Sequence, residues 1–198
     1  MVRWLRPLAV APVLVAMIGL GGLALGRVYH GPLLAQLVLG AGAGAVAVSA
    51  GLRRAPAWCV APVSVLALAG YLALAARVSA AHAGVPGALP SVVSDALRNG
   101  IPRLLTAMIP VEPQPDTVVV PVVAAWLAGL AGAELALRAG RTLLGYAPVT
   151  LWYVGALYAV GPNAAPALRP TLAYAGLAAL GLAVTAQPDP SNRTSGHA

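Results

Sequence analysis

The sequence has few charged residues. Of its 198 residues only 9% are charged and 60% are hydrophobic, and the mean hydropathy is +0.84. A water-soluble domain carries about 25% charged residues, because its surface faces water. Disordered chains are also rich in charged and polar residues. The composition therefore excludes a soluble enzyme and a disordered chain, and it predicts an all-α, polytopic transmembrane helix bundle.

Lysine and phenylalanine are absent, and Cys59 is the single cysteine. One cysteine excludes an internal disulfide and a cysteine-based zinc site, and the three histidines lack the spacing of metal ligands. All twelve basic residues are arginines, which give a net charge of +7. They stand singly or in pairs between apolar runs, a pattern that indicates lipid headgroups rather than nucleic acid as the partner. We expect no cofactor and no metal.

The apolar runs set the number of membrane spans. A bilayer core of about 30 Å needs roughly 20 apolar residues in a helix. Five apolar runs have that length. A sixth run has 16 residues and reaches only about 24 Å, enough for a locally thinned membrane. The chain is thus predicted to have about six spans in a membrane domain of residues 1–186, followed by a polar tail, 187–198. The predicted spans are 7–26, 33–52, 57–76, 117–137, 142–161 and 171–186.

The first run also has some features of a secretory signal. Arg3 and Arg6 precede it, and small residues end it at 24–26. The apolar core of a signal peptide usually has 7–15 residues, and this one is longer. The length favours an uncleaved first helix, with a cleaved signal as the alternative.

The distribution of arginines predicts the topology. Arginine pairs stand in two short connections, at 53–54 and at 138–141, whereas the other short connections hold single arginines. Basic residues close to the span ends favour the cytoplasmic side. We therefore expect a multi-pass protein of the plasma (cytoplasmic) membrane with both termini in the cytoplasm and the segment 77–116 outside.

That outer segment contains an amphipathic pattern. Apolar residues recur from Val93 to Met108 at spacings of three and four, with polar residues opposite. Gly100 and Pro102 interrupt the pattern, which predicts a pair of short helices, 91–99 and 102–109. Such helices lie on the outer leaflet or on the bundle itself. The candidate residues of this interfacial helix pair are Asp95, Arg98 and Arg103.

Glu134 is the one strong case of an ionisable residue inside a predicted span. Such residues are the first functional candidates in a membrane protein. Arg138 follows four residues later, the favourable order for an ion pair on a helix. The position near the inner boundary favours a structural ion pair, with a coupling carboxylate as the alternative. No catalytic motif is recognisable, and Cys59 has no histidine base nearby in the predicted topology.

One stretch is similar to a known family. Residues 95–110 read DALRNGIPRLLTAMIP and lead through an acidic, proline-rich link into VVVPVVAAWLAGLAGAELALR, which ends at Arg138. This stretch resembles the N-terminal membrane domain of actinobacterial transglutaminase-like membrane proteins. The resemblance implies an extracytoplasmic transglutaminase-like domain with a Cys-His-Asp triad. The sequence holds no such domain, so no catalytic residue carries over, and we expect a truncated or split member of the family.

Three classes of function follow in order of preference. The first is a non-catalytic membrane domain of the cell envelope that anchors or positions a transglutaminase-like domain or other membrane subunits. The second is a small multi-span transporter or permease subunit, which the span count favours but for which no polar site lies at mid-membrane. An intramembrane enzyme comes third, because paired acids and nucleophile–base pairs are missing from the predicted spans.

Overall fold

The computed structural model describes residues 2–106, 110–161 and 167–186, and within those ranges it is helical with no strand. A single turn of 3₁₀ helix, Leu52–Arg54, follows the second helix, and a π-turn, Glu134–Arg138, continues the fifth. The predicted all-α bundle is confirmed. The helices are α1 (Val2–Leu25), α2 (Leu33–Gly51), α3 (Ala57–Ala83), α4 (Leu89–Thr106), α5 (Pro115–Ala133), α6 (Thr142–Val160) and α7 (Leu168–Ala186).

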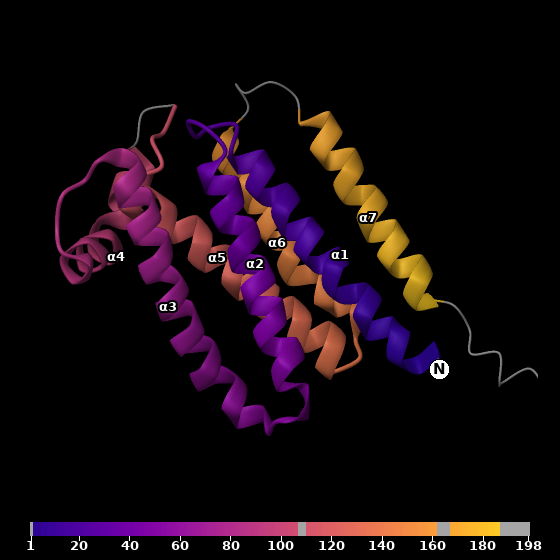
Figure 1. Ribbon diagram of the computed structural model, residues 1–198. Helices are drawn as coiled ribbons and strands as arrows, with labels where there is room; N and C mark the ends of the chain where they lie inside the picture. Colours follow the sequence, from indigo (N-terminus) through magenta and orange to yellow (C-terminus); the bar gives the residue numbers. More distant parts are fainter. Residues whose placement is uncertain (1, 107–109, 162–166, 187–198) are drawn as a thin grey trace, which may run out of the picture.

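Most helices run up and down along a shared, tilted direction, whereas α4 is seen nearly end-on at the side of the bundle (Figure 1). Among the described residues, four segments are long and apolar enough to cross a membrane, and they correspond to α2, α3, α5 with its π-turn, and α6. The chain is therefore a membrane protein. In α1 the apolar stretch Val10–Leu25 is shorter, and crossing by α1 and α7 stays a prediction.

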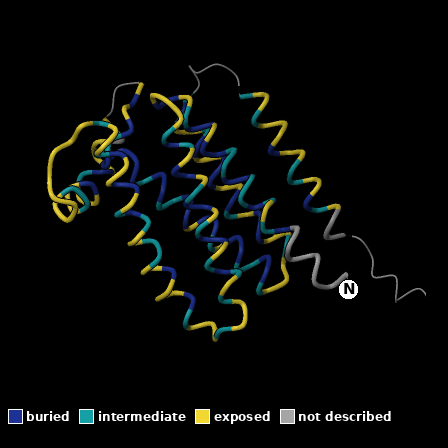
Figure 2. The backbone as a smooth tube through the Cα atoms, in the orientation of Figure 1, coloured by how far each residue is buried: buried dark blue, intermediate teal, exposed yellow. Residues whose placement is uncertain are grey.

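The central helix is α5, which contacts α1, α2, α3, α4 and α6. Of its 19 residues 13 are buried, and its sequence is apolar on every side, as expected for a helix enclosed by others. Trp126 is buried in its middle and donates a hydrogen bond from Nε1 to Ser64 Oγ of α3 at 3.0 Å. Burial is concentrated along α5 and its neighbours, while the outward faces of α3 and α7 are exposed (Figure 2).

Glycines allow the closest helix contacts. A Cβ atom on Gly145 of α6 would lie 2.6 Å from Ala136 Cβ and 2.8 Å from the Gly132 carbonyl oxygen of α5. No real side chain fits in that space, so the backbones of α5 and α6 touch. Such contacts matter in lipid, where helices gain little by hiding apolar surface from one another.

The third helix is longer than predicted. It continues seven residues past the expected end at residue 76 and stops at Gly84, whose φ of 65° lets its N–H bond to the Ala80 carbonyl. The residues 77–83 are therefore helix rather than connection. An arginine such as Arg77 marks the neighbourhood of a membrane boundary, but it does not end a helix. The last helix begins three residues before the predicted start at residue 171.

The prediction of a helix pair between the third and fourth spans is wrong, because α4 is one helix through Gly100 and Pro102. The proline removes only one backbone donor from the helix. The glycine faces the start of α5, where a Cβ would lie 2.9 Å from the Asp116 carbonyl oxygen, so it permits a contact instead of a break. Residues 107–109, the predicted end of the second helix of the pair, lie outside the described residues.

The glycine contact gives a first prediction. Gly145→Ala should destabilise the protein by about 1–3 kcal/mol, because the new methyl group overlaps the backbone of α5. The matched change Gly155→Ala lies on the same helix in open space, so it should be neutral or stabilise the helix by up to about 1 kcal/mol. Unfolding of the detergent-solubilised protein by SDS measures both. Equal midpoints for the two variants would contradict the contact.

Candidate functional site

The candidate residues gather at opposite ends of the bundle. We call one the Glu134 end, where α5 ends beside the α2–α3 turn, and the other the Tyr29 end, where α1 and α6 end and α5 begins (Figure 1). Each end holds one cluster of charged and polar side chains. The two clusters are described in turn.

At the Glu134 end, Arg138 Nη1 lies 3.4 Å from Glu134 Oε2. The other guanidinium nitrogen, Nη2, donates to the carbonyl oxygens of Leu52 and Ala55 at 2.9 and 2.5 Å. Ser49 Oγ of α2 donates to Glu134 Oε1 at 2.7 Å. The two charges thus tie the end of α5 to the turn between α2 and α3.

Both charged residues lie on the π-turn, in which the N–H of Ala139 bonds to the Glu134 carbonyl five residues earlier at 3.0 Å. Isolated π-turns are often found at functional sites. The i, i+4 spacing correctly predicted the contact between Glu134 and Arg138. It could not predict the contact with Ser49, which is 85 residues away in an apolar helix. The backbone carbonyl acceptors carry no sequence signal at all. With Glu134 and Arg138 paired to each other and bonded to α2 and the α2–α3 turn, the arrangement suits a structural latch.

At the Tyr29 end, Arg103 of α4 forms two ion pairs. Its Nη1 lies 2.5 Å from Asp116 Oδ2 and 3.3 Å from Asp95 Oδ2. Asp116 is buried, with 6% of its side chain exposed, and it also accepts a hydrogen bond from the Thr117 N–H at 2.9 Å. The hydrogen bond with Asp116 raises the pKa of Arg103, so this residue stays charged at every physiological pH. The contact fastens α4 to the first turn of α5.

Tyr29 belongs to the same end. Its hydroxyl donates to the Thr117 carbonyl at 2.8 Å, and its backbone is paired with Val111 in an isolated bridge. Burial raises the pKa of Tyr29, and the nearby charge of Asp116 raises it further. No local pattern predicts this contact, because Tyr29 and Thr117 are 88 residues apart.

The face of α4 that contacts the protein is the small and polar one. Ala96 and Gly100 are buried, whereas Leu97 and Ile101 of the predicted apolar face are 57% and 63% exposed. The apolar face was predicted to lie either on the outer leaflet or on the bundle. Leu97 and Ile101 do not pack on the bundle. Arg98 is exposed and has no ion pair or hydrogen bond from its side chain within the described ranges.

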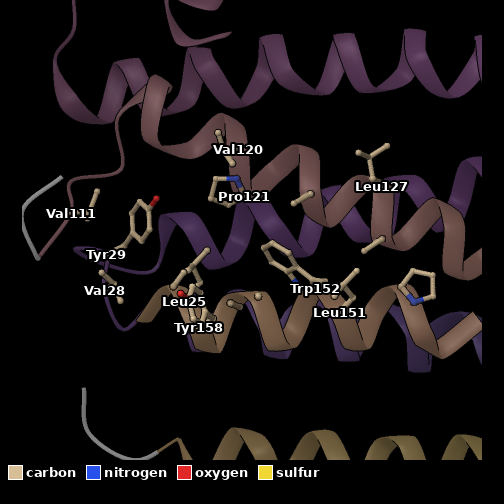
Figure 3. A pocket seen from close by; sticks show the side chains of 16 residues that line it. Leu25, Val28, Tyr29, Val111, Val120, Pro121, Leu127, Leu151, Trp152 and Tyr158 are labelled. Atoms are coloured by element: carbon tan, nitrogen blue, oxygen red, sulfur yellow. The ribbon is translucent and has the colours of Figure 1, made fainter. Parts of the chain in front are cut away.

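A cavity of about 860 Å³ lies between α5 and α6 (Figure 3). Its lining is almost wholly apolar, and the one indole in it, Trp152, already donates from Nε1 to the Ile18 carbonyl at 3.2 Å. A smaller crevice of about 250 Å³ lies at the Tyr29 end, with Asp95, Arg103 and Asp116 in its lining. These three are already paired with one another.

Other candidates from the sequence do not assemble into a site. Cys59 is half-buried in the first turn of α3. Within the described ranges no group of three histidine, cysteine, aspartate or glutamate side chains is placed to hold a metal ion. His197 lies outside those ranges.

The fold and these clusters define the class as an all-α membrane protein. No family model, no curated protein and no solved structure matches the chain. Any function more specific than this class is therefore argued from the residues themselves.

The Arg103 contacts give a second prediction. Arg103→Gln and Asp116→Asn should both loosen α4, because each removes the charge-assisted bond to α5. Arg98→Gln is the matched control, an exposed arginine on the same helix. Hydrogen–deuterium exchange of the α4 amides in detergent should rise in the first two variants and stay at the wild-type rate in the third. Unchanged exchange in Arg103→Gln would show that the pair does not hold α4.

Tyr29 gives a third prediction, for alkaline pH. A phenol whose pKa is higher in the folded than in the unfolded protein stabilises fully below about pH 10 and loses that contribution as pH rises further. Tyr29→Phe should therefore make the loss of stability above pH 10 shallower, at a cost near neutral pH of about 1 kcal/mol for the lost hydrogen bond. His30→Gln, an exposed neighbour of Tyr29 without a phenol, is the control. Equal slopes for wild type and Tyr29→Phe would contradict this assignment.

Proposed function

We propose that this chain is a non-catalytic membrane domain that anchors or positions a transglutaminase-like extracytoplasmic domain. The observation that carries the proposal is the place of the stretch that resembles that family. Residues 95–138 include most of α4 and all of α5 with its π-turn, and so they form the centre of the bundle and supply the ion-paired residues of both polar clusters. A scaffold needs such a centre, and the ion-paired charges of this stretch hold α4 to α5 and the end of α5 to the α2–α3 turn.

In the proposed orientation, the protein lies in an actinobacterial plasma membrane. The Tyr29 end is on the outer side and the Glu134 end is on the cytoplasmic side. Arg53 and Arg54 stand in the turn at the Glu134 end, near Arg138 and Arg141. This gathering supports a cytoplasmic location of that end by the positive-inside rule. The exposed apolar residues of α4 then face the outer leaflet, on the side where a partner domain would sit.

A fourth prediction tests the anchoring role. The DNA next to this gene should encode a transglutaminase-like domain, in the same or a neighbouring frame. Expressed with this chain, that domain should sediment with the membrane fraction, and expressed with an unrelated six-span protein it should not. The same distribution with both partners, or neighbouring DNA without such a domain, would refute the proposal.

A small transporter or permease subunit is the second candidate, and the half-buried Glu134 on a π-turn favours it. Glu134→Gln distinguishes the two, because glutamine keeps an oxygen to accept the Ser49 hydroxyl but removes the charge. If the chain is a scaffold, Glu134→Gln should still retain the partner domain in the membrane fraction. Loss of a transport phenotype at normal expression would instead favour the permease.

A further inference from the structure

We propose that the cavity between α5 and α6 binds an acyl chain of an anionic phospholipid from the leaflet at the Tyr29 end. The proposal is independent of the anchoring role. It rests on the shape of the cavity, on the direction in which it opens, on its length and on the exposed arginine next in sequence to its lining.

The cavity is a wedge. At the Glu134 end, Gly132 and Gly145 bring the backbones of α5 and α6 into contact, and from there the two helices diverge toward the Tyr29 end (Figure 3). Small residues line the facing walls, with Ala124 and Ala128 on α5 and Gly155 on α6. Small side chains on diverging helices leave a trough that the protein does not fill.

The wedge has a back wall and an open side. Leu25, Val28 and Tyr29, from the end of α1 and the turn after it, form part of the lining. On the rim, Leu151 and Tyr158 of α6 are 72% and 88% exposed. Because α5 and α6 are membrane-spanning helices, an exposed side of this kind faces hydrocarbon rather than water. An occupant therefore enters sideways from the bilayer and is itself apolar.

The length of the wedge selects an acyl chain over a helix. Its lining covers residues 120–128 of α5 and 148–159 of α6, which correspond to about 12 and 17 Å at the helical rise. One leaflet contributes about 15 Å to the hydrocarbon core, whereas a spanning helix of a partner needs about 30 Å. A volume of about 860 Å³ is also within the range of small-molecule sites. The length of the wedge therefore fits an acyl chain of a lipid in one leaflet.

The mouth of the wedge favours an anionic headgroup. Val28 and Tyr29 of the lining are flanked in sequence by Arg27 and His30, and both flanking residues are exposed. Within the described ranges the Arg27 side chain has no ion pair, and the Tyr29 hydroxyl is already bonded to Thr117. Arg27 is therefore a candidate to pair with the phosphate of a lipid whose chain lies in the wedge.

The fifth prediction uses phosphatidylglycerol with a photoreactive group in its acyl chain, in vesicles made otherwise of phosphatidylcholine. After irradiation of the reconstituted protein, mass spectrometry should place the label on α5 and α6 peptides that line the wedge. Unlabelled phosphatidylglycerol should compete better than phosphatidylcholine, and Arg27→Gln should remove that preference without moving the label.

Filling the wedge is the decisive change. Gly155→Leu should reduce labelling about tenfold or more, because its side chain enters the space of the acyl chain. Gly70→Leu on α3 is the matched control, since a Cβ at either glycine meets no atom within 4 Å. Ala159→Leu, a second lining residue, tests the same space if Gly155→Leu purifies poorly. Label spread evenly over all lipid-facing helices, labelling unchanged by both filling variants, or label blocked by a tightly bound protein helix would each overturn the proposal.

Discussion

The contact between Gly132 and Gly145 sets the arrangement of the helices around α5. In hydrocarbon, the attraction between helices comes from close packing and from hydrogen bonds, because lipid tails solvate apolar side chains as well as other helices do. The touching backbones of α5 and α6 supply the packing. They also fix the point from which the two helices diverge, so the same contact that holds α5 against α6 opens the cavity between them.

Hydrogen bonds and ion pairs complete the attachment of α5, and the ion pairs lie at its two ends. Arg103 reaches its first turn from α4, and Arg138 reaches from its last turn to the α2–α3 connection. Between these ends, the Trp126–Ser64 bond ties the middle of α5 to α3. Charged groups at the ends avoid the high cost of an unpaired charge in the bilayer core. The helix is thus held by charges at both ends and by small residues and neutral hydrogen bonds inside.

Much of the fold was predictable from the long apolar runs, in which charged residues are scarce. The apolar runs gave α2 and α6 to within a residue at each end, because helix length in a membrane follows from bilayer thickness. The i, i+4 spacing gave the Glu134–Arg138 pair, a contact within one helix. The break predicted at Gly100 failed, since local propensity cannot show that a neighbouring helix needs the space. Contacts such as Ser49 with Glu134, and the wedge itself, depend on how distant helices cross, which no local pattern encodes.

The π-turn has a consequence for how this protein tolerates insertions and deletions. A π-turn contains one residue more than an α-turn, so side chains before and after Glu134 follow two separate helical registers. Deleting one residue there would restore a continuous α-helix and rotate everything beyond it by about 100°. Arg138 would then leave the Leu52 and Ala55 carbonyls that it now contacts. The single extra residue therefore lets the last turn, with Arg138, align with the α2–α3 turn independently of α5, which stays aligned with the membrane interior.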